Sequence, residues 1–127
     1  MGLTHITLRV ANAADEKRNE DLVCLVDSGA WHTVVPGDLL QRLGIAPHSI
    51  RRFTLADGSI ITRRLATAVL EYEGLRGDSP VIVGEPGDYP LVGVLTLETF
   101  GIMLDPLKRE LRPMTLRMPT IISPPSP

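Results

Sequence analysis

The sequence of 127 residues has a single cysteine, a formal net charge of only −2 and no long apolar run. Cys24 cannot form an internal disulfide, and because it lies in an apolar segment we interpret it as a buried, unreactive thiol. This cysteine usage favours a cytoplasmic location. The small net charge gives no electrostatic reason to expect nucleic acid or an anionic membrane as a partner.

Other signals are missing as well. No apolar run approaches the roughly 20 residues that a membrane-spanning helix needs, and the N-terminus lacks the basic and apolar regions of a signal peptide. Cys24 and the histidines His5, His32 and His48 do not have the spacing of metal ligands. No glycine-rich loop of the kind that cradles phosphate is present. We therefore expect no membrane partner, no metal and no cofactor.

The composition that is present indicates one folded domain. Hydrophobic residues make up 43% of the chain and the mean hydropathy is +0.11, which favours a compact core over disorder. A chain of this length suits a single domain. We assign the domain to residues 1–114 and treat residues 115–127 as a proline-rich C-terminal tail, because proline cannot join the centre of a sheet.

Sequence patterns predict mostly strands. Alternating polar and apolar residues, or short apolar runs between turn signals, favour strands at residues 4–10, 21–26, 50–56, 60–64, 67–73, 79–84, 102–105 and 109–112. Short helices are expected at residues 37–43 and 95–100, and the polar residues 11–20 are interpreted as a hairpin connection. Short strands at regular spacing predict an all-β fold with a closed or partly closed barrel.

The segment at residues 24–35 is the most informative part of the chain. An apolar strand there runs directly into Asp27-Ser28-Gly29-Ala30. A carboxylate at the end of a buried strand is unusual, because desolvating an ionised group costs several kcal/mol. An Asp-Ser-Gly tripeptide taken alone is also a common turn, so the motif needs support from elsewhere in the chain.

Two later segments supply that support. Asp57-Gly58 is a strong hairpin turn between strand-like segments, because both of its residues tolerate a positive φ. Leu91-Val92-Gly93 is a short apolar strand, and it precedes the short helix and a final hairpin. In this order the chain resembles the single-domain, retropepsin-like aspartic proteases, particularly the small bacterial and archaeal forms. The resemblance covers about residues 21–113.

The resemblance implies a role for each residue of the first motif. Asp27 is expected to be the catalytic carboxylate, with one contributed by each subunit of a homodimer. Ser28 is expected to hydrogen-bond across the dimer, and Gly29 to let the two carboxylates approach closely. Ala30 matches the small fourth residue of the family motif. Trp31 departs from the pattern, because the family more often has a small polar residue there.

The resemblance also implies roles for the two later segments. Leu91, Val92 and Gly93 are expected to pack behind the active-site loop. A flap that closes over a bound peptide is expected at the hairpin turn, with its tip formed by Ala56, Asp57, Gly58 and Ser59. The expected fold is a retropepsin-like closed β-barrel with one or two short helices that works as a homodimer.

The expected function is that of an aspartic endopeptidase acting on peptides or proteins. Hydrolysis without a covalent intermediate needs one group to accept a proton and another to donate one. Two neighbouring carboxylates that share a proton meet this need, and one chain supplies a single Asp-Ser-Gly. An alternative is the same fold used as a non-catalytic dimerisation or peptide-binding module. A further possibility is a domain normally fused to another, with the tail as a linker.

Overall fold

The computed structural model describes residues 4–115 and 117–123, and within them strands account for 51% and helices for 11%. The strands are β1 (His5–Asn12), β2 (Asp15–Val26), β3 (Thr33–Pro36), β4 (Ser49–Thr54), β5 (Ile60–Tyr72), β6 (Leu75–Gly84), β7 (Leu91–Val92), β8 (Ile102–Leu104) and β9 (Leu111–Pro113). The helices are α1 (Gly37–Arg42) and α2 (Val94–Phe100). The prediction of a mostly β chain with short helices is confirmed.

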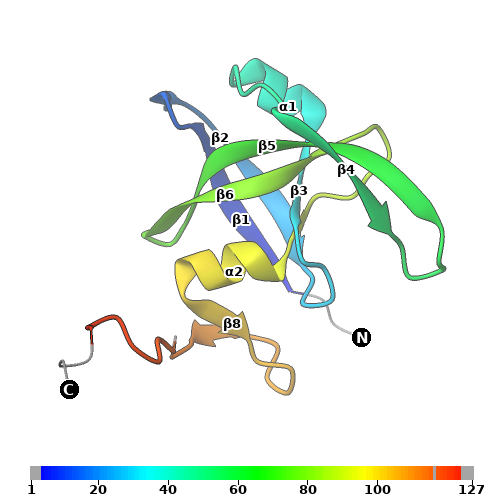
Figure 1. The fold of residues 1–127 in the computed structure, drawn as a ribbon. Coiled ribbons are helices and arrows are strands. Elements are labelled where there is room, and N and C mark those ends of the chain that lie inside the picture. Colours follow the sequence, from blue (N-terminus) through cyan, green and yellow to red (C-terminus); the bar gives the residue numbers. More distant parts are fainter. Residues whose placement is uncertain (1–3, 116, 124–127) are drawn as a thin grey trace.

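Seven of the strands form one sheet that closes into a ring. Their order is β1-β2-β7-β3-β6-β5-β4, and β1 also pairs with β5. That closing contact is antiparallel and places Val10 opposite Leu70, both of which are completely buried. Strand β4 pairs with β5 beyond the ring, and β8 and β9 form a separate pair. In Figure 1, α1 lies above the ring and α2 lies below it.

The predicted connection at residues 11–20 is wrong. Strand β1 continues to Asn12 and β2 begins at Asp15, so the two strands extend into a long hairpin with a short turn. Nearly every residue from Asp15 to Asp21 is exposed. An apolar alternation marks a strand only where one face is buried, so this part of β2 carries no such signal.

The strand boundaries around residues 60–84 also differ from the prediction. The segments 60–64 and 67–73 are one continuous strand, β5, and β6 begins at Leu75 rather than at residue 79. The turn between them is Glu73-Gly74, where both residues have positive φ angles of 46° and 83°. Gly77 lies within β6 and pairs with Leu70.

A single apolar core fills the ring. Leu8, Leu40, Leu70 and Val81 are among its completely buried side chains. Cys24 lies in the same cluster, and burial raises the pKa of its thiol to about 12. The thiol is therefore protonated at neutral pH, as expected for an unreactive core cysteine.

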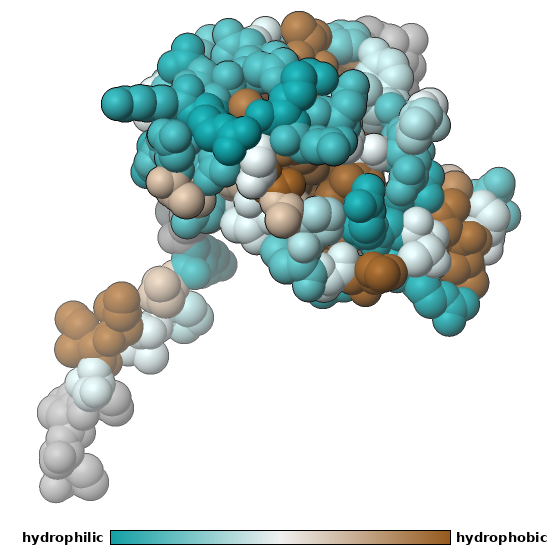
Figure 2. Space-filling view, turned by 90° about the horizontal axis from the view of Figure 1, so that it is seen from above, coloured by the Kyte–Doolittle hydropathy of each residue, from teal (hydrophilic) through white to brown (hydrophobic). Residues whose placement is uncertain are grey.

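The C-terminal segment has a different character from the domain. After Met114, whose N–H donates to the Gly101 carbonyl, residues 117–123 form neither strand nor helix. Figures 1 and 2 show this tail running away from the body of the molecule, with hydrophobic residues near its end. Ile121 and Ile122 are about 80% exposed. Residues 1–3 of the assigned domain, and residues 116 and 124–127 of the tail, lie outside the described residues.

None of the helices in the described part of the chain has the length and apolar character needed to cross a membrane.

Candidate active site

Asp27 directly follows β2, and β2 is paired with a neighbouring strand on each side. Strand β2 pairs with β1, and with β7 through the parallel contacts of Leu25 with Leu91 and Val26 with Val92. The Asp27 N–H donates to the Val92 carbonyl at 3.0 Å, so the register of β7 sets where this residue sits. The Asp27 side chain is half-buried.

The loop that follows β2, residues 27–32, is the candidate active-site loop, called the active-site loop below. It folds around the Asp27 carboxylate. The Gly29 N–H donates to Oδ1 of Asp27 at 2.9 Å, and the Ala30 N–H donates to the Asp27 carbonyl at 3.1 Å. A Cβ on Gly29 would lie 3.2 Å from the same carboxylate oxygen, so glycine leaves room for the carboxylate. One carboxylate oxygen is thus held by the backbone.

Gly93 brings β7 against the back of this loop. A Cβ at residue 93 would lie 2.6 Å from the carbonyl oxygens of both Trp31 and His32, which real Cβ atoms essentially never do. The flanking N–H groups of Val94 and Leu95 donate to the carbonyls of Ala30 and Trp31 at 2.8 and 3.0 Å. The structure therefore places Gly93 directly behind this loop, while Leu91 and Val92 pair with the end of β2 beside it.

A buried cluster of three hydroxyl groups supports the same junction. Thr33 Oγ1 accepts a hydrogen bond from the Gly93 N–H at 3.0 Å and lies 2.6 Å from Thr96 Oγ1. Ser79 Oγ is 2.9 Å from Thr96 Oγ1. All three side chains are completely buried. No sequence pattern points to these three residues, because nothing local distinguishes them from threonine and serine elsewhere in the chain.

Ser28 points away from this junction toward the surface. It is exposed, and within the described part of the chain its hydroxyl makes no hydrogen bond. Beside it lies a small apolar hollow of about 200 Å³, lined mainly by α2 and β8. The expected hydrogen bond of Ser28 across a dimer stays a prediction, because it needs a second chain.

A groove of about 570 Å³ opens in front of Asp27. Its walls come from the active-site loop, β4, β5 and the segment before β7. The larger apolar side chains that line it are Trp31, Val34, Phe53, Leu55, Ile61, Ile82 and Leu91. Its ionisable side chains are Asp27, His32, Arg63, Asp88 and Tyr89. Of all the residues that line the groove, five belong to the predicted site: Asp27, Gly29, Ala30, Ala56 and Leu91.

The β4–β5 hairpin forms one side of the groove. Phe53, Thr54, Leu55 and Ala56 line it, whereas Asp57, Gly58 and Ser59 form the turn beyond. Asp57 Oδ1 accepts the Ser59 N–H and hydroxyl at 2.9 and 2.6 Å, and these bonds lower the pKa of Asp57. Of the four predicted flap residues, only Ala56 therefore contacts the groove, and the contacting face extends back along β4.

His32 joins the active-site loop to this hairpin. Its ring makes an edge-to-face contact with Phe53, with centroids 5.3 Å apart and planes at 77°. Burial lowers the pKa of His32, and the nearby positive charge of Arg51 lowers it further. His32 is half-buried, at the edge of the core.

Asp88 and Arg63 form an ion pair in the groove. Arg63 donates from Nε and Nη2 to the two Asp88 oxygens at 2.7 and 2.8 Å. The Glu85 N–H also donates to Asp88 Oδ2 at 2.8 Å. Because Glu85 and Asp88 lie in the loop before β7 and Arg63 lies in β5, these bonds together hold the loop against β5. The Arg63 bonds lower the pKa of Asp88, partial burial opposes them, and the Glu85 bond lowers it again.

Within the described residues, the groove contains one carboxylate, Asp27, that no other side chain engages. Asp88 is engaged by Arg63, whereas no ion pair with Asp27 is found within the described residues. Asp105 is buried in the β8–β9 turn, where it accepts the N–H groups of Leu107 and Lys108, as expected for a turn carboxylate. Across residues 4–115 and 117–123, no group of three or more His, Cys, Asp or Glu side chains could hold a metal ion.

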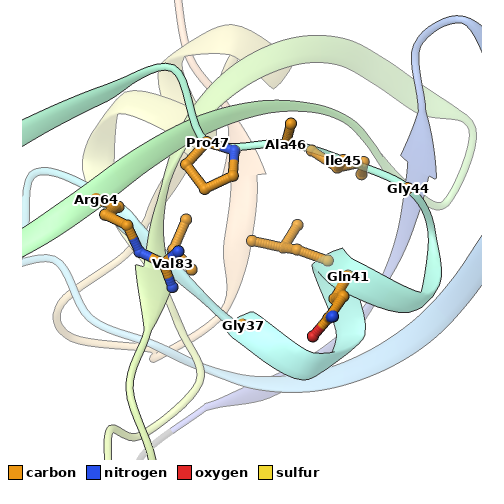
Figure 3. Close-up of a pocket in the computed structure, with 9 residues that line it drawn as sticks. Gly37, Gln41, Gly44, Ile45, Ala46, Pro47, Arg64 and Val83 are labelled. Carbon is orange, nitrogen blue, oxygen red and sulfur yellow. The ribbon is translucent and has the colours of Figure 1, made fainter.

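A second hollow of about 430 Å³ lies beside α1 (Figure 3). Leu40, Gln41, Ile45, Arg64 and Val83 are among the residues that line it. Its lining residues within the described chain include no carboxylate, histidine, cysteine or hydroxyl group, so they offer no general acid, general base or nucleophile. The groove at Asp27 is the better candidate for chemistry.

Comparison with known proteins finds no family model and no curated protein that matches this chain.

The hydroxyl cluster predicts a large effect of a small change. Thr96→Val keeps the shape of the side chain but leaves Thr33 and Ser79 without their shared partner. We expect the free energy of unfolding to fall by about 1–3 kcal/mol, measured by urea denaturation. Thr99→Val is the matched control, because Thr99 is exposed on the same helix, and its effect should stay within about 0.5 kcal/mol. Equal effects of the two substitutions would contradict a stabilising role of the cluster.

The Arg63–Asp88 pair predicts a pH-dependent loss of stability. Because the pKa of Asp88 is lowered by folding, its contribution is present above its ordinary pKa of 3.8 and is lost as the pH falls through the lowered value. Asp88→Asn should cost about 1–2 kcal/mol at pH 7 and progressively less below pH 4, measured by urea denaturation. Asp21→Asn, which removes an exposed ion pair with Arg9, should change little. A cost of Asp88→Asn that is independent of pH would refute this account.

Proposed function

We propose that the chain is a retropepsin-like aspartic endopeptidase that works as a homodimer, with one Asp27 from each subunit. The observation that carries the proposal is the placement of Asp27, a half-buried carboxylate held by the loop backbone at the mouth of a groove, with a hairpin along one side. The order of elements around it supports the retropepsin-like comparison, as does a sheet that closes into a ring.

The chemistry explains why two chains are needed. One group must take a proton from the attacking water while another gives a proton to the peptide carbonyl oxygen. Two carboxylates about 3 Å apart do both, because they hold one proton between them. Of the two carboxylates that line the groove among the described residues, Asp27 and Asp88, only Asp27 is left for this task, since Arg63 engages Asp88. The second carboxylate must then come from a second copy of the chain.

The surroundings of Asp27 suit such a pairing. Ser28 and Gly29 are exposed, so the loop can approach its symmetry mate without first unfolding. Trp31 is 55% exposed, which is unusual for so large an aromatic side chain and fits a surface covered by substrate or by the partner. The Ser28 hydroxyl is available for a hydrogen bond across the dimer.

The groove suits a peptide or protein substrate. Its apolar walls can bury side chains of an extended peptide, and the β4–β5 hairpin lies where a flap would close over it. The chemistry assigned to Asp27 requires no cofactor. We further propose action in the cytoplasm, where a lone buried thiol such as Cys24 stays reduced, without nucleic acid or a membrane as partner.

The first functional prediction concerns Asp27 itself. Asp27→Asn removes the ionisable carboxylate and should lower peptide hydrolysis at least about 10³-fold, because general acid and base catalysis are both lost. The circular dichroism spectrum and the dimer should be unchanged. Asp21→Asn, on the same strand, should keep full activity. Comparable hydrolysis by the Asp27→Asn and unmodified proteins would rule out the aspartic protease mechanism.

A second prediction concerns assembly and pH. Specific activity should fall as the protein is diluted through the dimer dissociation range, because neither chain has a complete site.

The pH–rate profile should be bell-shaped with an acidic optimum, because the dyad works only while it holds one proton. Specific activity measured against protein concentration tests the first expectation, and cleavage of a peptide library from about pH 3 to pH 8, with and without a statine-type inhibitor, tests the second.

Three results would count against the mechanism: constant specific activity from a proven monomer, activity that rises steadily into the alkaline range, or loss of activity to a chelator. Tight peptide binding by a confirmed dimer, with no cleavage at any pH, would instead favour a non-catalytic peptide-binding module.

A further inference from the structure

The β4–β5 hairpin places two arginines opposite one another on one face. In the antiparallel register Arg51 pairs with Arg63, and two residues further along β4 Phe53 pairs with Ile61. Side chains that are directly opposite share a face of the sheet, and so do residues two apart on one strand. Phe53, Ile61 and Arg63 line the groove, so Arg51 stands on the groove side of the hairpin, at its edge.

Only one of these two positive charges is compensated within the described chain. Asp88 pairs with Arg63 through two hydrogen bonds, whereas the Arg51 side chain forms neither an ion pair nor a hydrogen bond with any residue in the ranges 4–115 and 117–123. Like charges directly opposite each other destabilise a sheet, and Arg51 lacks a carboxylate partner within the described residues. A ligand that brings a negative charge to this edge would supply one.

A second observation places Arg51 near the groove. Its charge acts on His32, which lines the groove and contacts Phe53, and together with burial it lowers the pKa of that histidine. The other charged groups facing this space are Asp27, Arg63 and Asp88. Because Asp88 is paired with Arg63, it does not neutralise Arg51, and in the proposed mechanism Asp27 is the catalytic carboxylate. The edge of the groove near His32 therefore carries the unpaired positive charge of Arg51.

We propose that Arg51 is a specificity-determining residue that binds an acidic side chain, aspartate or glutamate, of a peptide lying in the groove. The inference rests on the proposed peptidase function and adds a substrate class to it. The guanidinium group presents several N–H donors in a plane and pairs well with a carboxylate. Because Arg51 is exposed, the selectivity should be modest, about fivefold at low salt, and should weaken as salt is added.

The chain contains a matched control for this test. Arg52 follows Arg51 on the same strand and is equally exposed, but strand alternation points it to the opposite face of the hairpin. The variants Arg51→Ala, Arg51→Glu and Arg52→Ala should all fold, because none of these side chains is buried.

The experiment uses pairs of peptides that differ only by Glu or Gln at each position flanking a cleaved bond. For the unmodified protein and the three variants, kcat/KM is measured for every pair at low and at moderate salt. At one position we expect about a fivefold preference for Glu. Arg51→Ala should abolish this preference, Arg51→Glu should reverse it in favour of Gln, and Arg52→Ala should retain it.

Binding of the same peptides to the Asp27→Asn variant separates this inference from the proposed function. Cleavage of Glu and Gln peptides at equal rates at every position would overturn the role of Arg51 while leaving the peptidase intact. Equal loss of the preference in Arg51→Ala and Arg52→Ala would overturn it as well. If no peptide is cleaved, the peptidase proposal fails, and a Glu preference in binding that depends on Arg51 would still support the site. Equal binding of both peptides would then refute it.

Discussion

The close approach of β7 to the active-site loop is the contact on which the rest of the site depends. Gly93 permits it, because any Cβ there would overlap the carbonyl oxygens of Trp31 and His32. Backbone hydrogen bonds from Asp27, Val94 and Leu95 close the junction on both sides of the glycine. The position of Asp27 is therefore set by backbone packing between the end of β2, β7 and the loop that follows β2.

Hydrogen bonding inside the core reinforces this junction. The hydroxyls of Thr33, Thr96 and Ser79 connect β3, α2 and β6, and Thr33 also accepts the Gly93 N–H. Among the described residues, no buried side-chain nitrogen or oxygen lacks a partner. Such a fully satisfied network holds its members in one arrangement, because any alternative would leave a polar group unpaired in the core. The network thus links α2 to the loop that carries Asp27.

Charges around the groove are distributed in a way that leaves Asp27 uncommitted. Arg63 holds Asp88, and this pair fixes the loop before β7 against the β4–β5 hairpin. The hairpin is also attached to the active-site loop by the contact of His32 with Phe53. The groove therefore has two firm contacts on its walls, while the hairpin turn at residues 57–59 extends beyond them. That arrangement is compatible with the proposed peptide-binding role, in which the hairpin turn closes over a bound chain.

The sequence by itself determined the mostly β class, the two short helices, the turn at Asp57-Gly58 and the Asp27 and Gly93 motifs, because each leaves a local signal. Tertiary structure alone decided the ring closure by Val10 and Leu70, the extension of β2 through residues 15–20 and the pairing of Arg63 with Asp88. An exposed strand has no buried face and hence no alternation to detect. The partner of a polar side chain is likewise chosen by residues distant in sequence, which come together only when the sheet closes.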